Sequence, residues 1–311
     1  MKVFVTGVAG QLGHDVMNEL NLRGMEGVGS DLAAEYAGIQ DGSPVTAMPY
    51  VSMDITDAES VRNTIQTAGA DAVIHCAAWT AVDAAEDAEN HAKVRKINVD
   101  GTQNIANVCK EMNIPMLYLS TDYVFDGQGT TPWEPDCKEY APLNVYGQTK
   151  LEGELAVSTT LDKYFIVRIA WVFGKNGKNF IKTMLNLGKK YDSLRVVCDQ
   201  IGTPTYTYDL SKLLCDMIVT DRYGYYHATN EGGYISWFDF TNEIFRQARE
   251  LGFSEYANCL VTPVTTAEYG ISKAARPFNS RLGKSKLTEN GFALLPTWQD
   301  ALSRYLQEIE F

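Results

Sequence analysis

The sequence has 311 residues, of which 45% are hydrophobic and 21% charged, so it can form one large domain or a main domain with a smaller lobe. The net charge of −12 would repel phosphate backbones and argues against nucleic-acid binding. The N-terminus lacks the apolar core of a signal peptide, no run approaches the roughly 20 apolar residues of a membrane span, and the six cysteines are scattered. We therefore expect a cytoplasmic protein with reduced thiols and no membrane association.

The first half of the chain alternates short apolar runs with helical patterns, which predicts parallel strands joined by helical crossovers. A polar stretch from Ala33 to Pro49 is expected to be a loop, and Asp57 is a plausible helix cap. The expected strands are 2–7, 24–31, 51–57, 71–78, 114–121 and 164–174, and the expected helices are 11–23, one after Asp57, about 87–112, and one carrying Tyr146.

Three glycines follow the first strand, where the chain turns into the first helix. Gly7, Gly10 and Gly13 enclose Gln11 and Leu12. Small residues let the backbone approach a pyrophosphate, and the N–H groups and positive end of the helix can bind it. A tight strand–helix turn without a ligand is the alternative. The pattern predicts dinucleotide binding by residues 7–13.

Further candidate cofactor contacts follow the next strands. Asp31 ends the second strand, where an acid usually accepts hydrogen bonds from the adenosine ribose and disfavours the extra phosphate of NADPH. A solvated loop aspartate is the alternative. Asp54 and Ile55, after the third strand, are placed to flank the adenine. Ala77 and Ala78, after the fourth, are small enough for cofactor approach, although simple packing also explains them.

The irregular pattern after residue 175 predicts a smaller lobe. We therefore expect a Rossmann-type doubly wound parallel sheet in an α/β protein. Residues 1–175 would form the dinucleotide-binding domain, and residues 176–311 mainly a substrate-binding lobe, with segments returning to the main sheet.

Tyr146 and Lys150 are four residues apart, as expected for an acid–base pair on one helix face. Tyr208–Lys212 and Tyr269–Lys273 have the same interval, so spacing alone decides nothing. The context favours Tyr146, because Ser120, Thr121 and Asp122 precede it at the end of a strand, and ligands of open parallel sheets bind at that edge. The other two pairs are expected to be structural or surface pairs.

Five segments, "GVAGQLG", "STDYVF", "NVYGQTK", "DQIGTPT" and "ARPFNSRL", resemble the extended short-chain dehydrogenase/reductases, and more narrowly the dTDP-4-dehydrorhamnose reductases. The resemblance covers almost the whole chain. It implies NADH- or NADPH-dependent reduction of the C4 keto group of dTDP-4-dehydro-β-L-rhamnose to dTDP-β-L-rhamnose, the last step of dTDP-L-rhamnose biosynthesis.

The resemblance implies that Tyr146 donates the proton, Thr121 hydrogen-bonds the substrate oxygen and Lys150 holds the nicotinamide ribose. A phenol with a pKa of about 10 is a poor acid–base group near neutrality, and a nearby ammonium is expected to lower that pKa.

Other roles follow from the resemblance alone. Implied cofactor contacts are Ala78, Trp79 and Thr80, and Asn98 would brace the site, unless it makes only a local helix hydrogen bond. Implied sugar contacts are Asp122 and Trp171, although core packing equally explains Trp171. The diphosphate contacts would be Arg276, Asn279, Ser280 and Arg281, with a surface salt bridge as the alternative for the arginines.

Two alternatives stay open: another sugar-nucleotide epimerase or dehydratase of the superfamily, or a non-catalytic NADP-binding regulatory subunit. Some relatives use Mg²⁺ at a dimer contact. The sequence assigns no acid to such a metal and leaves a homodimer open.

Overall fold

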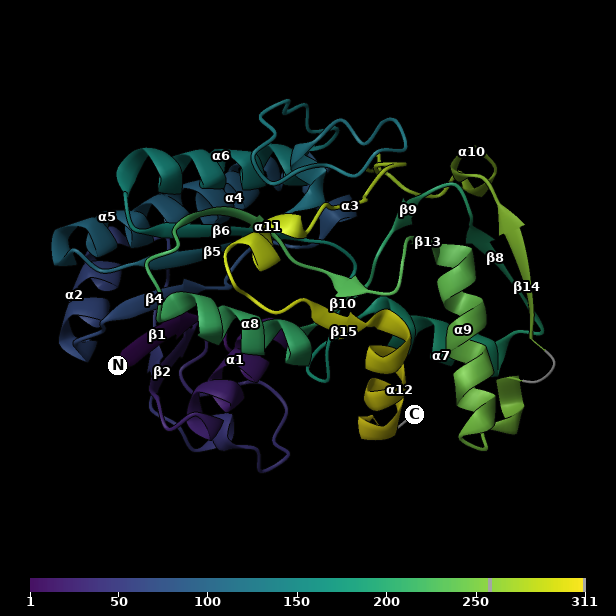
Figure 1. Cartoon of the computed structure of the whole chain (residues 1–311), viewed down its shortest axis with the longest axis horizontal. Coiled ribbons are helices and arrows are strands. Elements are labelled where there is room, and N and C mark those ends of the chain that lie inside the picture. Colours follow the sequence, from purple (N-terminus) through teal and green to yellow (C-terminus); the bar gives the residue numbers. More distant parts are fainter. Residues whose placement is uncertain (257–258, 310–311) are drawn as a thin grey trace.

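A seven-stranded parallel sheet forms the centre of the protein in the computed structural model, which describes residues 1–256 and 259–309 (Figure 1). The strand order is β11-β6-β5-β4-β1-β2-β3, and every neighbouring pair is parallel. The chain leaves β1 in one direction toward β3 and then returns to β4 on the other side. This reversal creates a crevice at the carboxyl ends of β1 and β4, where open α/β sheets bind ligands. The Rossmann-type prediction is confirmed.

The strands of this sheet are β1 (Lys2–Thr6), β2 (Glu26–Asp31), β3 (Tyr50–Ser52), β4 (Ala72–His75), β5 (Met116–Thr121), β6 (Tyr164–Ile169) and β11 (Gly224–His227). The helices and helical turns around it are α1 (Gln11–Leu22), η1 (Pro44–Thr46), α2 (Ala58–Ala68), α3 (Val82–Ala85), α4 (His91–Arg95), η2 (Lys96–Gly101), α5 (Thr102–Met112), η3 (Asp122–Val124), α6 (Val145–Thr160), α8 (Thr207–Ile218) and α11 (Ser285–Glu289).

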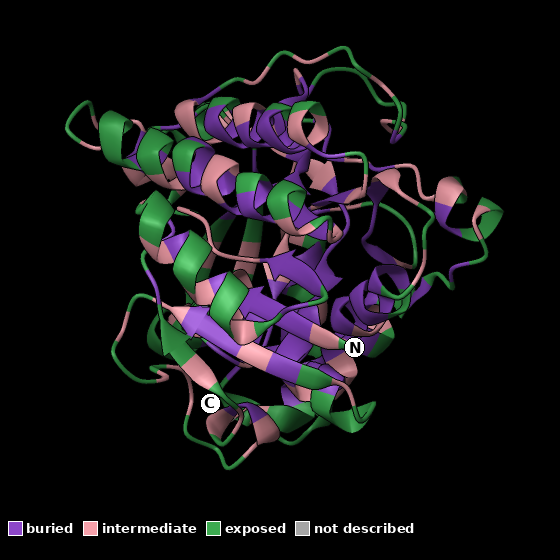
Figure 2. Cartoon of the chain, turned by 90° about the vertical axis from the view of Figure 1, so that its left-hand side faces the viewer, coloured by how far each residue is buried: buried purple, intermediate pink, exposed green. Residues whose placement is uncertain are grey.

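The sheet is covered on both faces, so its central strands β1, β4, β5 and β6 are almost entirely buried, whereas the edge strand β3 is partly exposed (Figure 2). Alternation along β1 shows how the two layers form, since successive side chains of a strand point to opposite faces. Val3 and Val5 pack with α1 and α8, whereas Phe4 packs with α2, α5 and α6. Asp57 caps α2 by accepting from the backbone N–H groups of Glu59 and Ser60 at 3.0 and 3.1 Å, as predicted.

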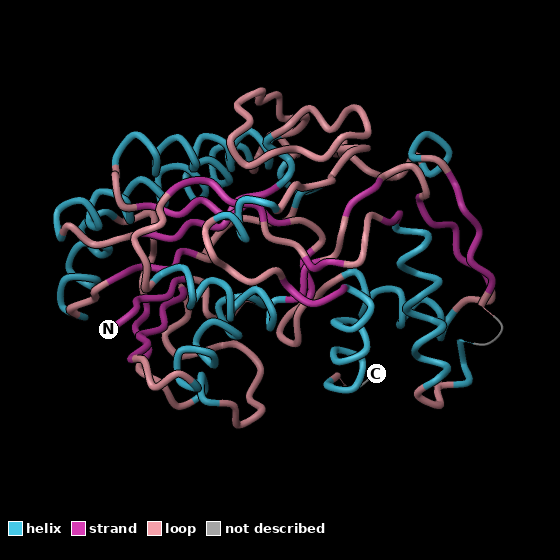
Figure 3. The backbone as a smooth tube through the Cα atoms, viewed as in Figure 1, coloured by secondary structure: helices cyan, strands magenta, loops and turns pink. Residues whose placement is uncertain are grey.

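A second lobe, on the right in Figures 1 and 3, has its own hydrophobic cluster around Phe173, Tyr206 and Phe240. The division of the chain after residue 175 stays a prediction. Two elements from beyond that residue belong to the main sheet layer: β11 pairs with β6, and α8 packs on one face of the sheet. The remaining elements are β7 (Val172–Phe173), α7 (Phe180–Lys190), β8 (Ser193–Val197), β9 (Ile201–Gly202), β10 (Thr205–Tyr206), β12 (Asn230–Glu231), β13 (Ile235–Ser236), α9 (Trp237–Glu250), η4 (Ser254–Tyr256), β14 (Leu260–Val264), α10 (Thr266–Tyr269), β15 (Leu295–Thr297) and α12 (Trp298–Glu308).

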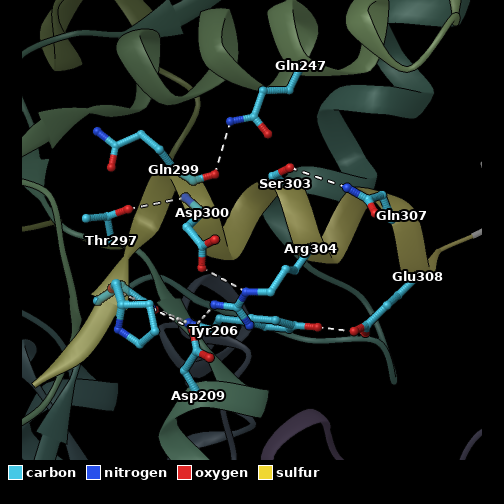
Figure 4. Close-up of polar contacts among 12 residues, drawn as sticks. Tyr206, Asp209, Gln247, Thr297, Gln299, Asp300, Ser303, Arg304, Gln307 and Glu308 are labelled. Carbon is cyan, nitrogen blue, oxygen red and sulfur yellow. Dashed lines mark hydrogen bonds and ion pairs between the residues drawn. The ribbon is translucent and has the colours of Figure 1, made fainter. Parts of the chain in front are cut away.

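Helix α12 is fastened to the main body by a polar network (Figure 4). Arg304 donates to Asp209 of α8 at 2.7 Å and to Asp300 at 2.8 Å. The Tyr206 hydroxyl donates to Glu308 at 2.7 Å. These bonds join α12 to both α8 and β10.

Two predicted elements are interrupted. The helix expected at about 87–112 begins at His91 and contains the π-helical turn η2, where Asn98 bonds the backbone of Trp79. The strand expected over 164–174 ends at Ile169 and resumes as β7, because Trp171 takes a left-handed conformation with φ of 50°. A bulky residue in that conformation breaks a strand.

Within the described residues, no helix is both long and apolar enough to cross a membrane. The same residues contain no cluster of three or more His, Cys, Asp or Glu side chains arranged to hold a metal ion.

Candidate active site

A cavity of about 940 Å³ opens at the carboxyl ends of the central strands. It extends from the glycine turn after β1 to the ends of β5 and β6, and it brings together most of the residues predicted from sequence. The predicted residues that line it are Gly7, Gly10, Gln11, Leu12, Gly13, Asp31, Asp54, Ile55, Ala77, Ala78, Thr80, Thr121, Asp122, Tyr146, Lys150 and Trp171.

The turn between β1 and α1 requires its glycines. Gly7 has a φ of 72°, and a Cβ there would lie 2.7 Å from the backbone nitrogen of Ala77. A Cβ on Gly13 would lie 2.3 Å from the Gly7 carbonyl oxygen. Gly10 begins α1 without a side-chain cap, so the first amides of this helix remain suited to an anion. The predicted phosphate-binding turn therefore has the geometry that its chemistry needs.

The Asp31 carboxylate lies beside this turn. Its Oδ2 accepts from the Ala9 backbone N–H at 3.0 Å, and its Oδ1 accepts from the Leu32 N–H at 2.8 Å. These bonds hold the side chain at the end of β2, in the wall of the cavity. An acid so held can accept further hydrogen bonds from hydroxyl groups.

Helix α6 brings Tyr146 and Lys150 under the end of β5. Asn144 starts this helix by accepting from the Gly147 N–H at 2.7 Å. The Lys150 Nζ donates to the Leu119 carbonyl at 2.7 Å and lies 4.1 Å from the centre of the Tyr118 ring. The Tyr146 ring packs edge-on against the Tyr123 ring, with ring centres 5.6 Å apart, and Tyr146 lines the cavity together with Thr121.

The expected lowering of the phenol pKa is wrong for this conformation. Burial raises the pKa of Tyr146, the Asp122 carboxylate raises it further, and the hydrogen bond with Thr121 opposes both. Lys150 has its own perturbation, because burial lowers its pKa to about 7 although Glu154 opposes this. The Lys150 ammonium donates its hydrogen bond to the Leu119 carbonyl. It therefore does not stabilise the phenolate form of Tyr146 in this conformation.

Asp122 is 1% exposed and lies next to Thr121, whose hydroxyl donates to it at 3.0 Å. Burial raises the pKa of Asp122 to about 6, and the hydrogen bonds from Ser280 and Thr121 oppose this effect. Ser280 does not line the cavity, and its hydroxyl acts on the site only by lowering the pKa of Asp122. A buried acid with a pKa near neutrality can both accept and donate hydrogen bonds.

Three aromatic side chains form part of the cavity wall. Trp171 stacks on Trp237 of α9 with ring centres 3.6 Å apart and planes inclined by 15°, and Phe180 of α7 packs against Trp237 with centres 4.4 Å apart. Sequence reasoning missed Trp237, Phe180 and the cavity-lining Lys178. No motif marks them, because their place in the wall depends on how the second lobe packs on the first.

Several predicted residues lie outside the cavity lining. The amide of Trp79 bonds Asn98. Arg276 forms a bidentate ion pair with Asp83 at 3.0 and 2.7 Å. Asn279 donates to the carbonyls of residues 128 and 131, and Arg281 donates to the Asn279 side chain at 3.0 Å. These groups fasten the segment around residues 275–282 to its neighbours instead of forming the cavity wall.

The other two Tyr–Lys pairs are absent from the cavity lining. Lys212 lies 4.0 Å above the Tyr208 ring on α8, and Lys273 forms an ion pair with Asp87 at 2.8 Å. The Lys273–Asp87 ion pair lies on the surface, with the side chains 62% and 38% exposed; that neither Tyr–Lys pair is catalytic stays a prediction.

Comparisons with known proteins agree with this geometry. The family model for the RmlD substrate binding domain matches residues 1–311. The chain belongs to this family. Among curated relatives, the dTDP-4-dehydrorhamnose reductase of Shigella flexneri is 38% identical over 82% of this chain and 85% of its own, and that of Aggregatibacter actinomycetemcomitans is 37% identical over 97% of both chains. A crystal structure of the Bacillus anthracis dTDP-4-dehydrorhamnose reductase in complex with NADP superposes with a TM-score of 0.86, at 36% identity and 99% coverage of both chains. The resemblance inferred from the sequence is confirmed.

Proposed function

We propose that this protein is an oxidoreductase that uses NADH or NADPH to reduce the C4 keto group of dTDP-4-dehydro-β-L-rhamnose, forming dTDP-β-L-rhamnose. The observation that carries the proposal is that Tyr146, Lys150 and Thr121 line one cavity together with the glycine turn. The names of the relatives and the NADP complex support it.

The bound dihydronicotinamide would supply the hydride. As hydride reaches the carbonyl carbon, negative charge develops on the oxygen and needs a proton donor. Tyr146 is the proposed donor: its raised pKa keeps the phenol protonated but also makes it a weaker acid, so the donor role needs the ammonium of Lys150 close by to lower that pKa. Thr121 would hydrogen-bond the same oxygen. Lys150 would exchange the Leu119 carbonyl for the hydroxyls of the nicotinamide ribose.

For the cofactor, the glycine turn would hold the pyrophosphate and Asp31 the adenosine ribose. Asp54 and Ile55 would flank the adenine, and Ala77 and Ala78 would admit the cofactor to the sheet edge. The Asp31 carboxylate in the cavity wall would repel a 2′-phosphate, which supports a preference for NADH.

For the sugar nucleotide, Asp122 and Trp171 would contact the deoxysugar, since both line the cavity. Ser280 would act through Asp122. Arg276 would reach the diphosphate only by leaving or sharing Asp83, its ion-pair partner. A homodimer, a cytoplasmic location and an effect of Mg²⁺ stay predictions.

The decisive experiment follows NADH or NADPH consumption by purified protein with dTDP-4-dehydrorhamnose. Tyr146→Phe should lower kcat by about 10²–10⁴-fold, the usual contribution of a general acid, with little change in cofactor affinity. Tyr208→Phe is the matched control, since it removes a hydroxyl from a Tyr–Lys pair of equal spacing outside the cavity.

The outcomes separate the alternatives. Sustained cofactor consumption supports a reductase, whereas an epimerase or dehydratase would retain its NAD and a regulatory subunit would show no turnover. Wild-type kcat in Tyr146→Phe would refute the proton-donor role.

A further inference from the structure

A short segment of the second lobe, residues 174–179, lies across the glycine turn. The Asn176 Nδ2 donates to the Ala9 carbonyl at 2.8 Å and to the Gly10 carbonyl at 3.3 Å. The Asn179 Nδ2 donates to the Gln11 side chain at 3.0 Å. Two side chains of the segment therefore hold it against the start of α1.

The same segment is fixed on its other side. Asn179 caps α7 by accepting from the Lys182 N–H at 3.0 Å, and its Nδ2 also donates to the Tyr305 hydroxyl at 2.8 Å. Tyr305 belongs to α12 and donates to the Gly174 carbonyl at 3.1 Å. The segment thus joins the glycine turn to α12, and hydrogen bonds hold the residues on both sides of Lys178 in place.

Lys178 lies in this segment between the two anchoring asparagines and lines the cavity. The other lysines near it are engaged: Lys175 forms an ion pair with Asp41 at 2.7 Å, and the Lys182 Nζ donates to the carbonyl of Gly177 at 3.0 Å. Within residues 1–256 and 259–309, Lys178 takes part in none of the hydrogen bonds or ion pairs that we identify. Lys178 is exposed, and it shares the cavity lining with Gly10 and Gln11 at the uncapped start of α1.

We propose that Lys178 binds the cofactor pyrophosphate from the second lobe, opposite the glycine turn. The inference rests on the proposed function, because it requires a nicotinamide dinucleotide in the cavity. The amides of α1 supply only partial positive charge, and the chain as a whole carries −12. A full positive charge from Lys178 would offset this field locally and form a charge-assisted hydrogen bond with phosphate.

The test measures dissociation constants of NADH, NADPH and ADP-ribose without sugar nucleotide, by calorimetry. Lys178→Ala should weaken all three by at least about tenfold, since the loss of a hydrogen bond to a charged group corresponds to about 10- to 150-fold. Lys178→Arg should stay within about threefold of the wild type because it keeps the charge. The effect of Lys178→Ala should shrink as salt rises, since the site is open to solvent.

Lys190→Ala is the matched control. It removes one positive charge from the far end of α7, outside the cavity lining, and should leave all three constants unchanged. Thermal unfolding monitored by circular dichroism would verify that each variant is folded.

The outcomes are distinct. Unchanged constants in Lys178→Ala would overturn the inference while leaving the proposed function intact. A loss confined to NADPH would also overturn it, since it would place the ammonium at the 2′-phosphate. Failure of the wild type to bind any dinucleotide would overturn the proposed function together with the inference.

Discussion

Arg168 of β6 and Glu154 of α6 form a buried ion pair, with both side chains 0% exposed. The guanidinium Nε and Nη2 each donate to the carboxylate at 2.8 Å. The same group donates to the Pro135 carbonyl and the Tyr140 hydroxyl, both at 3.1 Å. Glu154 lies one turn after Lys150 on α6, so the pair connects α6 to β6 and to the loop that precedes α6.

Glu154→Gln would leave a guanidinium in the interior without its counter-charge. Removing one partner of a buried pair costs about 3–5 kcal/mol, a large part of the roughly 5–15 kcal/mol that stabilises a typical protein. Arg168→Met should cost a similar amount because it strands the carboxylate. The double variant removes both charges, so its loss should be only about 1–3 kcal/mol, from the hydrogen-bonding groups left unpaired.

Urea unfolding followed by tryptophan fluorescence would measure these free energies for both single variants and the double variant. Arg62→Met is the control, because Arg62 pairs with Glu111 on the surface, with the two side chains 55% and 39% exposed, and should cost about 1 kcal/mol or less. Single-variant losses below about 1 kcal/mol, or losses that simply add in the double variant, would refute the reasoning.

Two further predictions concern activity. Asp31→Ala should lower the ratio of kcat/KM for NADH to that for NADPH by about tenfold, since losing the carboxylate removes a ribose acceptor and a repulsive charge; an unchanged ratio would show that Asp31 does not select the cofactor. Burial lowers the pKa of Lys150 to about 7, so the ammonium form is lost as pH rises through that value and kcat/KM for reduction should fall above about pH 7. Lys150→Arg, whose charge persists, should remove this decline from the pH profile measured between pH 5 and about pH 9; a decline at the same pH in both proteins would assign it to another group.

Local chemistry made part of this protein predictable from its sequence. The glycine spacing reports a backbone turn, since Gly7 needs its positive φ and Gly13 its missing Cβ. The Asp57 cap and the alternation along β1 likewise depend on near neighbours. Spacing alone did not distinguish the Tyr146–Lys150 pair from Tyr208–Lys212. The Ser120–Asp122 segment at the end of a strand was needed to select Tyr146.

Tertiary packing decided the remaining features. Trp171 and Trp237 meet only because the second lobe folds back on the first, and Lys178 reaches the cavity only because Asn176 and Asn179 fasten its segment to the glycine turn. Arg276 is likewise directed to Asp83 and not to the cavity. These contacts join residues distant in the chain, and their geometry depends on how whole elements pack, which no local pattern of residues records.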